Sequence, residues 1–211
     1  MNSLEVVGLK KTIKGVTVLE NINLSLTGGN VYAFQGENGC GKTMLFRVLS
    51  GLSKPTEGKI IYNGELLTPK SCLPKTGIIL ENASLFPQFT AYQNLLYLAQ
   101  INNHIGPKKI EEALRRVGLD PKDNRTVRKF SLGMKKRLVI AQAIMEAPDF
   151  LFLDEPTNAI DTSGVELVHK IIREEAQRGA VVLMASHIAQ DVSGLADVCY
   201  RMEGGRICYE K

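Results

Sequence analysis

The feature that most constrains the fold is the octapeptide GENGCGKT at residues 36–43. A short apolar segment, 31–35, precedes it and predicts a strand. The segment 42–51 that follows has the pattern of a helix, with Gly51 as its C-terminal stop. A glycine-rich loop of this spacing binds phosphate when it joins a strand to a helix. The chain is therefore predicted to contain the strand–loop–helix unit of an α/β protein.

The residue types in this loop suit nucleotide phosphates. Gly39 and Gly41 let backbone amides approach phosphate oxygens, and the N-terminus of the following helix adds partial positive charge. Lys42 can reach the β- and γ-phosphates, and Thr43 can ligate Mg²⁺. An ordinary glycine-rich turn is the alternative interpretation. We expect the loop to contact the nucleotide through Gly36, Glu37, Asn38, Gly39, Cys40, Gly41, Lys42, Thr43 and Met44.

Hydrophobic patterning extends the α/β organisation along the chain. Apolar segments at 150–156 and 180–186 predict buried strands, and the amphipathic segment between them predicts a helix that ends at Gly179. Alternating apolar residues in the segment 17–26 predict a strand of the N-terminal β part. Buried strands that alternate with helices indicate a mostly parallel sheet with both faces covered.

Two hairpins and a helical insertion complete the expected organisation. Asn63-Gly64 between apolar flanks predicts one hairpin turn, and Gly204-Gly205 predicts another. Residues 88–128 change character and carry helical patterns, which indicates an inserted helical region.

Two neighbouring acids end the predicted strand at 150–156. Asp154 and Glu155 lie where a carboxylate holds Mg²⁺ in many proteins with a phosphate loop. The second acid could polarise an attacking water. The alternative is that both acids are simply solvated at the strand end. The phosphate loop upstream favours the Mg²⁺ interpretation over this alternative.

A second anion site is predicted in the segment FSLGMKKRLVIAQAIMEAP. Ser131 is a suitable N-cap, and Pro148 lies just beyond the last turn of the predicted helix. The helix N-terminus, with Ser131 and Gly133, can bind an anion. The basic run 135–137 fits a solvated face or a packing edge, and we assign it no role with nucleotide.

Composition excludes several other classes. The chain has 211 residues, 44% of them hydrophobic, and a formal charge of +4, which suits one globular domain and does not itself argue for nucleic acid. Its four cysteines form no CxxC pair, so a zinc or redox motif is not expected. We expect reduced thiols in the cytoplasm, because the first residues carry no signal-peptide pattern. No apolar run approaches the roughly 20 residues that span a bilayer.

Together these motifs resemble the nucleotide-binding domain of ATP-binding cassette (ABC) transporters over nearly the whole chain. FSLGM resembles the family's signature motif, NAID at 158–161 its D-loop, and SHIAQDV places His187 at its switch histidine. The resemblance implies one domain over 1–211 with a P-loop NTPase (RecA-like) core at 1–81 and 146–211. That core would include an antiparallel β part, and 82–145 would form a helical subdomain.

The resemblance also implies an activity and partners. It implies ATP hydrolysis with Mg²⁺, coupled to a separate transmembrane permease that holds the chain at the inner face of the cell membrane. Two such domains, identical or different, would pair head to tail, with each ATP between one phosphate loop and the partner's signature helix. Ser131 and Gly133 would then bind the partner's nucleotide. No nucleic-acid partner is implied.

Matching positions carry the family's roles onto this sequence. Lys42 and Thr43 would bind phosphate and Mg²⁺, Asp154 would support Mg²⁺, and Glu155 would be the general base. His187 would contact the γ-phosphate. Asp161 would communicate across the dimer, whereas His104 and His169 match no functional position and are expected at the surface or in packing.

The sequence departs from the family pattern at several positions. Ile13 stands where an aromatic ring normally stacks on adenine, and it can pack on the base without stacking. The signature contains Leu132-Gly133-Met134 instead of Gly-Gly-Gln, and Cys40 occupies a loop position more often filled by a smaller residue.

Glu81 is the departure with the greatest mechanistic consequence. It stands where the family carries the glutamine of the Q-loop, which would bring it near Mg²⁺ and the γ-phosphate. We expect it to couple transport to hydrolysis. An acid here, together with SLGM, resembles the subgroup that handles bacitracin-type antibiotics and lantibiotic immunity, which favours export.

Three other functions of a phosphate loop fit the sequence less well. An ABC protein that acts on DNA would need a long coiled coil between phosphate loop and signature, and a ribosome-associated one normally carries two cassettes. A small P-loop kinase would explain the phosphate loop but neither FSLGM nor LDEPTNAID.

Overall fold

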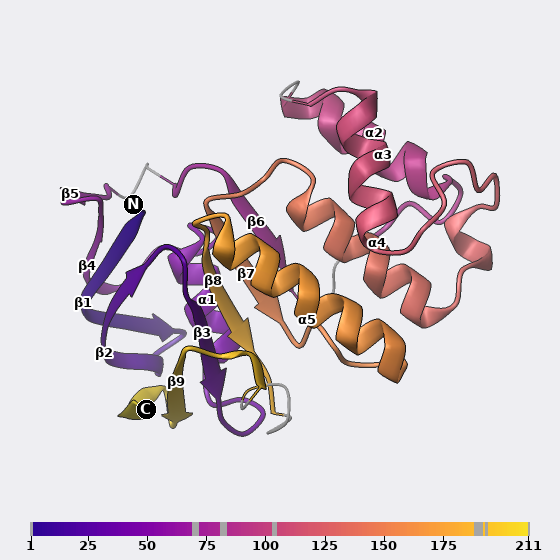
Figure 1. Ribbon diagram of the computed structural model, residues 1–211. Coiled ribbons are helices and arrows are strands. Elements are labelled where there is room, and N and C mark those ends of the chain that lie inside the picture. Colours follow the sequence, from indigo (N-terminus) through magenta and orange to yellow (C-terminus); the bar gives the residue numbers. More distant parts are fainter. Residues whose placement is uncertain are drawn as a thin grey trace.

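The structure is a computed structural model that describes residues 2–68, 72–80, 84–102, 105–187, 192 and 194–210. Its elements are arranged around two sheets (Figure 1). An antiparallel sheet has the order β2-β1-β4-β5, and a six-stranded sheet has the order β10-β9-β3-β8-β7-β6. The antiparallel strands are β1 Ser3–Ile13, β2 Val16–Thr27, β4 Glu57–Tyr62 and β5 Glu65–Leu66.

The six-stranded sheet is mostly parallel, as the buried apolar segments predict. Strand β3 pairs in parallel with β8 and β9, and β7 pairs in parallel with β8 and β6, whereas β10 is antiparallel to β9. The strands are β3 Val31–Gln35, β6 Thr76–Ile79, β7 Phe150–Asp154, β8 Val181–Ala185, β9 Val198–Glu203 and β10 Arg206–Glu210.

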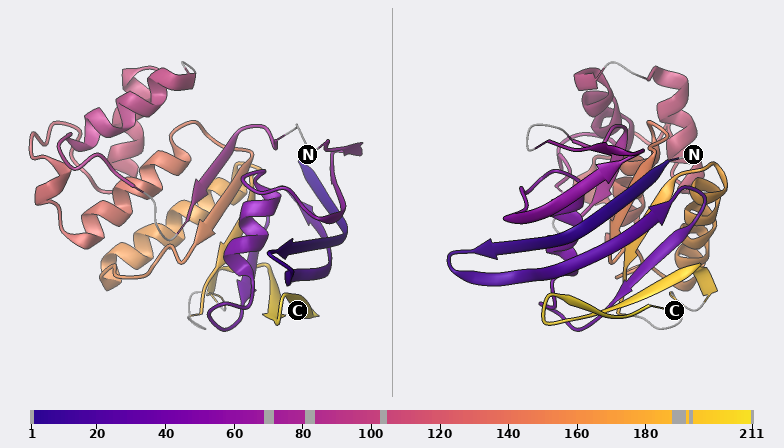
Figure 2. Two further views of the ribbon diagram at one scale, coloured as in Figure 1. Left: turned by 180° about the vertical axis from the view of Figure 1, so that it is seen from behind. Right: turned by 90° about the vertical axis from the view of Figure 1, so that its left-hand side faces the viewer.

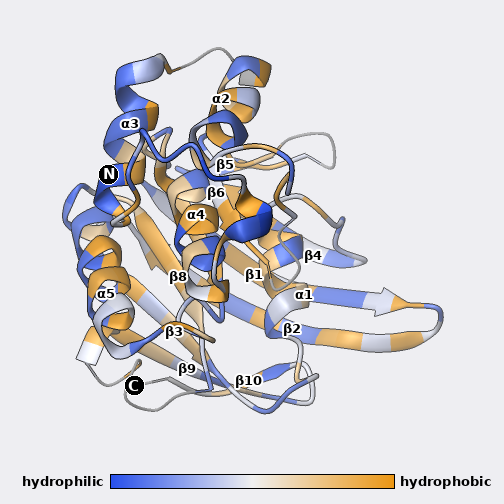
Figure 3. Cartoon of the chain, turned by 90° about the vertical axis from the view of Figure 1, so that its right-hand side faces the viewer, coloured by the Kyte–Doolittle hydropathy of each residue, from blue (hydrophilic) through white to orange (hydrophobic). Residues whose placement is uncertain are grey.

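Helices cover both faces of this sheet. The helices are α1 Lys42–Leu49, α2 Ala91–Asn102, α3 Pro107–Arg116, α4 Leu132–Ile144 and α5 Thr162–Gln177, with a 3-10 turn at Val127–Lys129. Alternate residues of strand β7 point to opposite faces of the sheet. Because both faces are covered, the strand is buried along its whole length. Phe150 and Phe152 pack in the core that contains α1 and the antiparallel sheet, and Leu151 and Leu153 pack in the core beneath α4 and α5. Figure 2 shows these layers from two further sides, and Figure 3 shows that hydrophobic residues predominate along β3 and β8.

The close approach of α4 to the sheet depends on a glycine. A Cβ atom on Gly77 of β6 would lie 2.1 Å from the carbonyl oxygen of Ala143 in α4. The helices α2, α3 and α4 share one hydrophobic core with β7, β8 and α5. The boundary between a core at 1–81 and 146–211 and a helical subdomain at 82–145 remains a prediction.

The predicted fold class is confirmed, and so are both hairpin turns. Asn63 and Gly64 have φ values of 49° and 84°, the pair of positive angles that a two-residue type I′ turn requires. Gly204 and Gly205 have φ values of 52° and 78° and join β9 to β10 in the same way.

Candidate active site

A cavity of about 550 Å³ opens beside the phosphate loop. It is bordered by β2, the phosphate loop with the start of α1, the end of β7 and the segment after β8, so that residues from four parts of the sequence meet there. Its lining consists of Val18, Asn38, Gly39, Gly41, Lys42, Thr43, Met44, Arg47, Asp154, Glu155, Asn158 and His187.

The loop holds the Lys42 ammonium in place through its own backbone. Lys42 is only 7% exposed, and its Nζ donates to the carbonyl oxygens of Gly36 at 2.7 Å and Glu37 at 3.1 Å. Gly41 at the N-cap of α1 has φ 111°, a left-handed conformation that a side chain would disfavour. The cation is thus fixed at the start of a helix, where anions bind.

Thr43 and Asp154 form a pair of oxygen ligands at the edge of the cavity. The Thr43 hydroxyl donates to Asp154 Oδ2 at 2.6 Å, and Asp154 is 3% exposed at the end of β7. A hydroxyl and a carboxylate are hard oxygen ligands of the kind that Mg²⁺ prefers. In the described part of the chain, no group of three or more His, Cys, Asp or Glu side chains could hold a metal by itself. The pair therefore fits a Mg²⁺ ion that takes its remaining ligands from phosphate and water.

Glu155 has the geometry of a candidate base. Its side chain is 13% exposed, and its Oε1 lies 2.9 Å from Nδ1 of His187. Its Oε2 is buried and has no hydrogen-bond partner among the described residues. The backbone has φ 51°, a conformation that costs on the order of 1–3 kcal/mol for a residue with a side chain. Histidine thus orients one oxygen of a carboxylate that lines the cavity.

Ser131 and Gly133 do not line the cavity of their own phosphate loop. Ser131 caps α4, because its Oγ accepts a hydrogen bond from Met134 N at 3.2 Å. A Cβ atom on Gly133 would lie 3.8 Å from the carbonyl oxygen of Ala159, so the start of α4 lies beside residues 158–161. The predicted second anion site at the start of α4 is therefore not part of this cavity.

Asp161 occupies the N-cap position of α5. Its Oδ2 accepts a hydrogen bond from Ser163 Oγ at 2.6 Å, and this bond is the main reason that the pKa of the Asp161 carboxyl lies below its ordinary value. The field of Arg137 lowers the same pKa further.

Three other residues that the sequence singled out either do not line the cavity or fall outside the residues that the structure describes. Ile13 is 38% exposed at the end of β1 and is not among the residues that line the cavity, whereas Val18 of β2 is. Glu81 and His104 lie outside the described residues, so their roles remain predictions. Val18 and Arg47 were not foreseen, although Arg47 stands one helical turn after Thr43.

Comparison with known proteins agrees with this geometry. A model of the ABC transporter family matches residues 19–158. The uncharacterized ABC transporter ATP-binding protein YybJ of Bacillus subtilis (strain 168) is 48% identical over 205 residues, which are 97% of this chain and 94% of that protein. The lantibiotic transport ATP-binding protein SrtF of Streptococcus pyogenes is 36% identical over 99% of this chain and 90% of its own length.

Longer relatives and solved structures extend the comparison. The bacitracin transport ATP-binding protein BcrA of Bacillus licheniformis is 37% identical over 91% of this chain, which covers 64% of BcrA. The structure of cbiO1 from Clostridium perfringens, part of the ABC transporter complex cbiONQ, has a TM-score of 0.83 and 27% identity over 98% of this chain and 87% of that one. The dimeric cassette MJ0796 has a TM-score of 0.88 at 23% identity, over 99% of this chain and 97% of that one, and shows the same fold.

The fold and the site define an ATP-binding, ATP-hydrolysing protein built on a phosphate loop. The chain belongs to the ABC transporter family, as one of its ATP-binding proteins. The expectation of a cassette ATPase is confirmed, and neither a kinase nor a DNA- or ribosome-acting protein is favoured. Within the described residues, none of the helices has the length and apolar character that crossing a membrane requires.

Proposed function

We propose that this chain hydrolyses Mg-ATP within a head-to-tail pair of cassettes and thereby powers a separate membrane permease. The observation that carries the proposal is the Glu155 carboxylate, with Oε1 held by His187 at 2.9 Å and Oε2 buried and unbonded within the described residues. This group faces the same cavity as Lys42 and the Thr43–Asp154 pair. A base, a phosphate-binding cation and a metal-ligand pair are the parts that ATP hydrolysis requires.

In this mechanism the side chains bind, orient and accept a proton. Loop amides and Lys42 bind the β- and γ-phosphates, and the Thr43 hydroxyl and the Asp154 carboxylate would hold Mg²⁺. When bound, Mg²⁺ would neutralise charge that develops on the phosphates. The Glu155 carboxylate, which lines the cavity, accepts the proton of the attacking water, and His187 fixes its orientation.

The second cassette completes the site. Ser131 and Gly133 form a helix N-terminus suited to an anion, and they do not line the cavity of their own phosphate loop. Their separation supports the hypothesis that they bind the γ-phosphate of a nucleotide held by a partner, either a second copy or a different cassette. Ile13 and Val18 would then provide aliphatic contacts to the adenine.

The named relatives suggest the cargo. SrtF and BcrA are described as lantibiotic and bacitracin transport proteins. We therefore propose export of a peptide antibiotic through a permease that holds this chain at the inner face of the membrane. Co-expression with a candidate permease tests this directly. The chain should copurify with the permease, and ATP hydrolysis should rise when the peptide is added. Absence of both effects would reject that cargo.

The test of the ATPase site is the substitution Glu155→Gln. It should slow hydrolysis by about 10²–10⁴, the usual contribution of a general base, while leaving ATP binding intact. Because bound ATP is then no longer consumed, a dimer should accumulate in gel filtration with Mg-ATP. Glu166→Gln, an exposed acid of α5, is the matched control and should hydrolyse ATP at the normal rate. A Glu155→Gln protein that stays monomeric and fully active would reject the assignment.

A further inference from the structure

A buried carboxylate interrupts the apolar face of α5. Val168, Ile171, Ile172 and Ala176 are buried along this face, and Glu175 lies among them with 1% of its surface exposed. An ionised carboxylate in such a position is strongly unfavourable unless charged partners and hydrogen bonds compensate for the lost water. Its partners therefore reveal what this position does.

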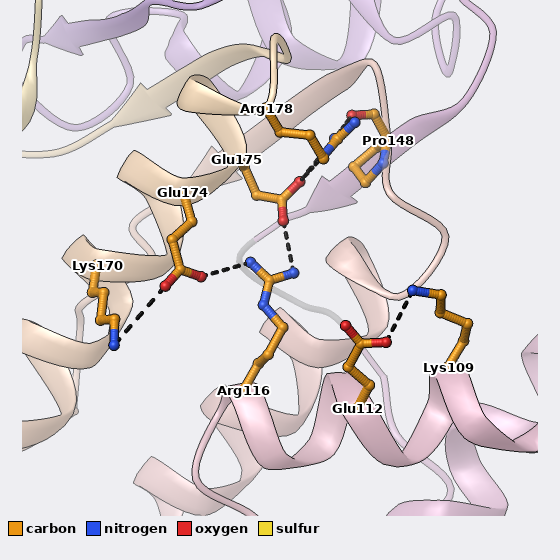
Figure 4. Close-up of polar contacts among 8 residues, drawn as sticks. All are labelled: Lys109, Glu112, Arg116, Pro148, Lys170, Glu174, Glu175 and Arg178. Atoms are coloured by element: carbon orange, nitrogen blue, oxygen red, sulfur yellow. Dashed lines mark hydrogen bonds and ion pairs between the residues drawn. The ribbon is translucent and has the colours of Figure 1, made fainter.

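Two arginines from different directions compensate Glu175 (Figure 4). Arg116, the last residue of α3, donates from one nitrogen to Glu175 Oε1 at 2.8 Å and from another to Glu174 Oε2 at 2.9 Å. Arg178 donates to Glu175 Oε2 from Nε at 2.9 Å and from a terminal nitrogen at 2.8 Å. Burial alone would lower the pKa of Arg116, but the hydrogen bonds with Glu175 and Glu174 raise it above its ordinary value.

The network continues toward the catalytic strand. Arg178 also donates to the carbonyl oxygen of Pro148, two residues before β7 begins at Phe150. Strand β7 ends at Asp154, and the candidate base follows it directly. The buried carboxylate is therefore tied to the segment that leads into the strand carrying the site's acids.

In the other direction the network reaches the signature helix. Arg137 of α4 donates to the carbonyl oxygens of Val117 at 3.2 Å and Gly118 at 3.1 Å. These are the two residues that follow Arg116. A chain of hydrogen bonds and short backbone segments thus runs from α4, whose N-cap is Ser131, through the end of α3 to Glu175 and the approach to β7.

Two neighbouring ion pairs of α3 join residues of the same helix and do not connect it to another element. Arg115 pairs with Glu111 at 2.6 Å, and Lys109 pairs with Glu112 at 2.9 Å, both between exposed side chains of α3 itself. Pairs of this kind contribute little to structure. Among the ion pairs that the described cations of α3 form, those of Arg116 are the ones that extend to α5.

We propose that Glu175, with Arg116 and Arg178, is a positioning cluster that sets the orientation of α3 and α4 relative to β7. It would thereby fix where Ser131 and Gly133 are presented to a partner's nucleotide. This inference rests on the proposed head-to-tail pair. None of the three residues of the cluster lines the ATP cavity, so their loss should change assembly and turnover and leave nucleotide binding by the single cassette intact.

The experiment compares Arg116→Met with Arg115→Met, the same exchange at the neighbouring residue. Both are made with and without Glu155→Gln. Three quantities are measured: the ATP dissociation constant of the monomer, the ATP-dependent dimerisation of the Glu155→Gln forms, and kcat. Amide hydrogen exchange across 107–144 and across β7 is followed in the same proteins.

Arg116→Met should weaken dimerisation and lower kcat by at least about tenfold, since each factor of ten is only 1.4 kcal/mol. The ATP dissociation constant should stay within about twofold, a difference of about 0.4 kcal/mol, because Arg116 does not line the ATP cavity. Exchange should rise across 107–144 and not in β7. Arg115→Met should match the parent protein in every measurement.

Equal behaviour of the two variants would overturn the proposal, and so would a parallel loss of ATP binding and turnover. Arg116→Lys is the second variant if Arg116→Met folds poorly. Its single ammonium keeps the charge but lacks the forked geometry that bridges two carboxylates, so it should show the same pattern in weaker form. If Glu155→Gln itself fails to dimerise, the proposed pairing is wrong, and hydrogen exchange still decides whether the cluster orients α3 and α4.

Discussion

Replacing Glu175 by glutamine should lower the free energy of unfolding by about 3 kcal/mol, at the lower end of the range for breaking a buried ion pair. The Glu175 side chain is 2% exposed and accepts hydrogen bonds at 2.8, 2.9 and 2.8 Å from two arginines. Glutamine keeps the shape, so no cavity is added. It removes the charge and turns an amide NH₂ toward a guanidinium. Arg116 and Arg178 keep 29% and 36% exposure, so water recovers part of the loss.

The assay is thermal and urea unfolding followed by circular dichroism. A loss of about 3 kcal/mol should lower Tm by about 6–12 °C in a domain of this size. Glu111→Gln is the matched control, because Glu111 is exposed and pairs with Arg115 four residues away in the same helix. Its effect should stay below about 0.5 kcal/mol. A Glu175→Gln protein that loses no more than this control would refute the assignment of Glu175 as a buried, compensated charge.

Two further predictions concern the phosphate loop and the signature helix. Ser131→Ala should destabilise the protein by about 1 kcal/mol in urea unfolding through loss of the N-cap, and dimerisation of the Glu155→Gln form should weaken as well. Cys40 is a buried residue of the loop, so a maleimide should label it slowly, and more slowly still with ATP, whereas exposed Cys72 should label rapidly either way. Peptide mapping checks this, and ATP-independent labelling of Cys40 would contradict the placement of the loop.

Much of the fold follows from local sequence signals. The residues of β3, β7 and β8 are apolar at nearly every position, which only a strand buried on both faces tolerates. Asn63-Gly64 and Gly204-Gly205 adopt positive φ angles that few other residue pairs accept at low energy. Such signals depend on a few neighbouring residues, so the sequence alone reveals them.

The polar contacts between distant segments could not be predicted in this way. Glu175 stands in a run of charges, REEAQR, that resembles a solvated face, and its partner Arg116 is 59 residues away. Arg137 likewise has the sequence context of a solvated or edge residue, yet it donates to two carbonyl oxygens at the end of α3. Only the packing of α3 and α4 against α5 decides which of these charges lose contact with water. Val18 could not be predicted either, because an aliphatic residue carries no chemical signal that it lines a nucleotide site.

The contact between Glu155 and His187 shows how the sheet register brings distant residues together. Asp154 of β7 is paired with Ala185 of β8, and the Glu155 N–H donates to the Ala185 carbonyl oxygen at 3.0 Å. His187 follows two residues later, which brings its Nδ1 to 2.9 Å from Glu155 Oε1. A register shift of one residue would move the strand by about 3.3 Å and turn each side chain to the opposite face, so this contact would be lost. The aliphatic residues that fix the pairing of β7 with β8 therefore also fix the distance between base and histidine.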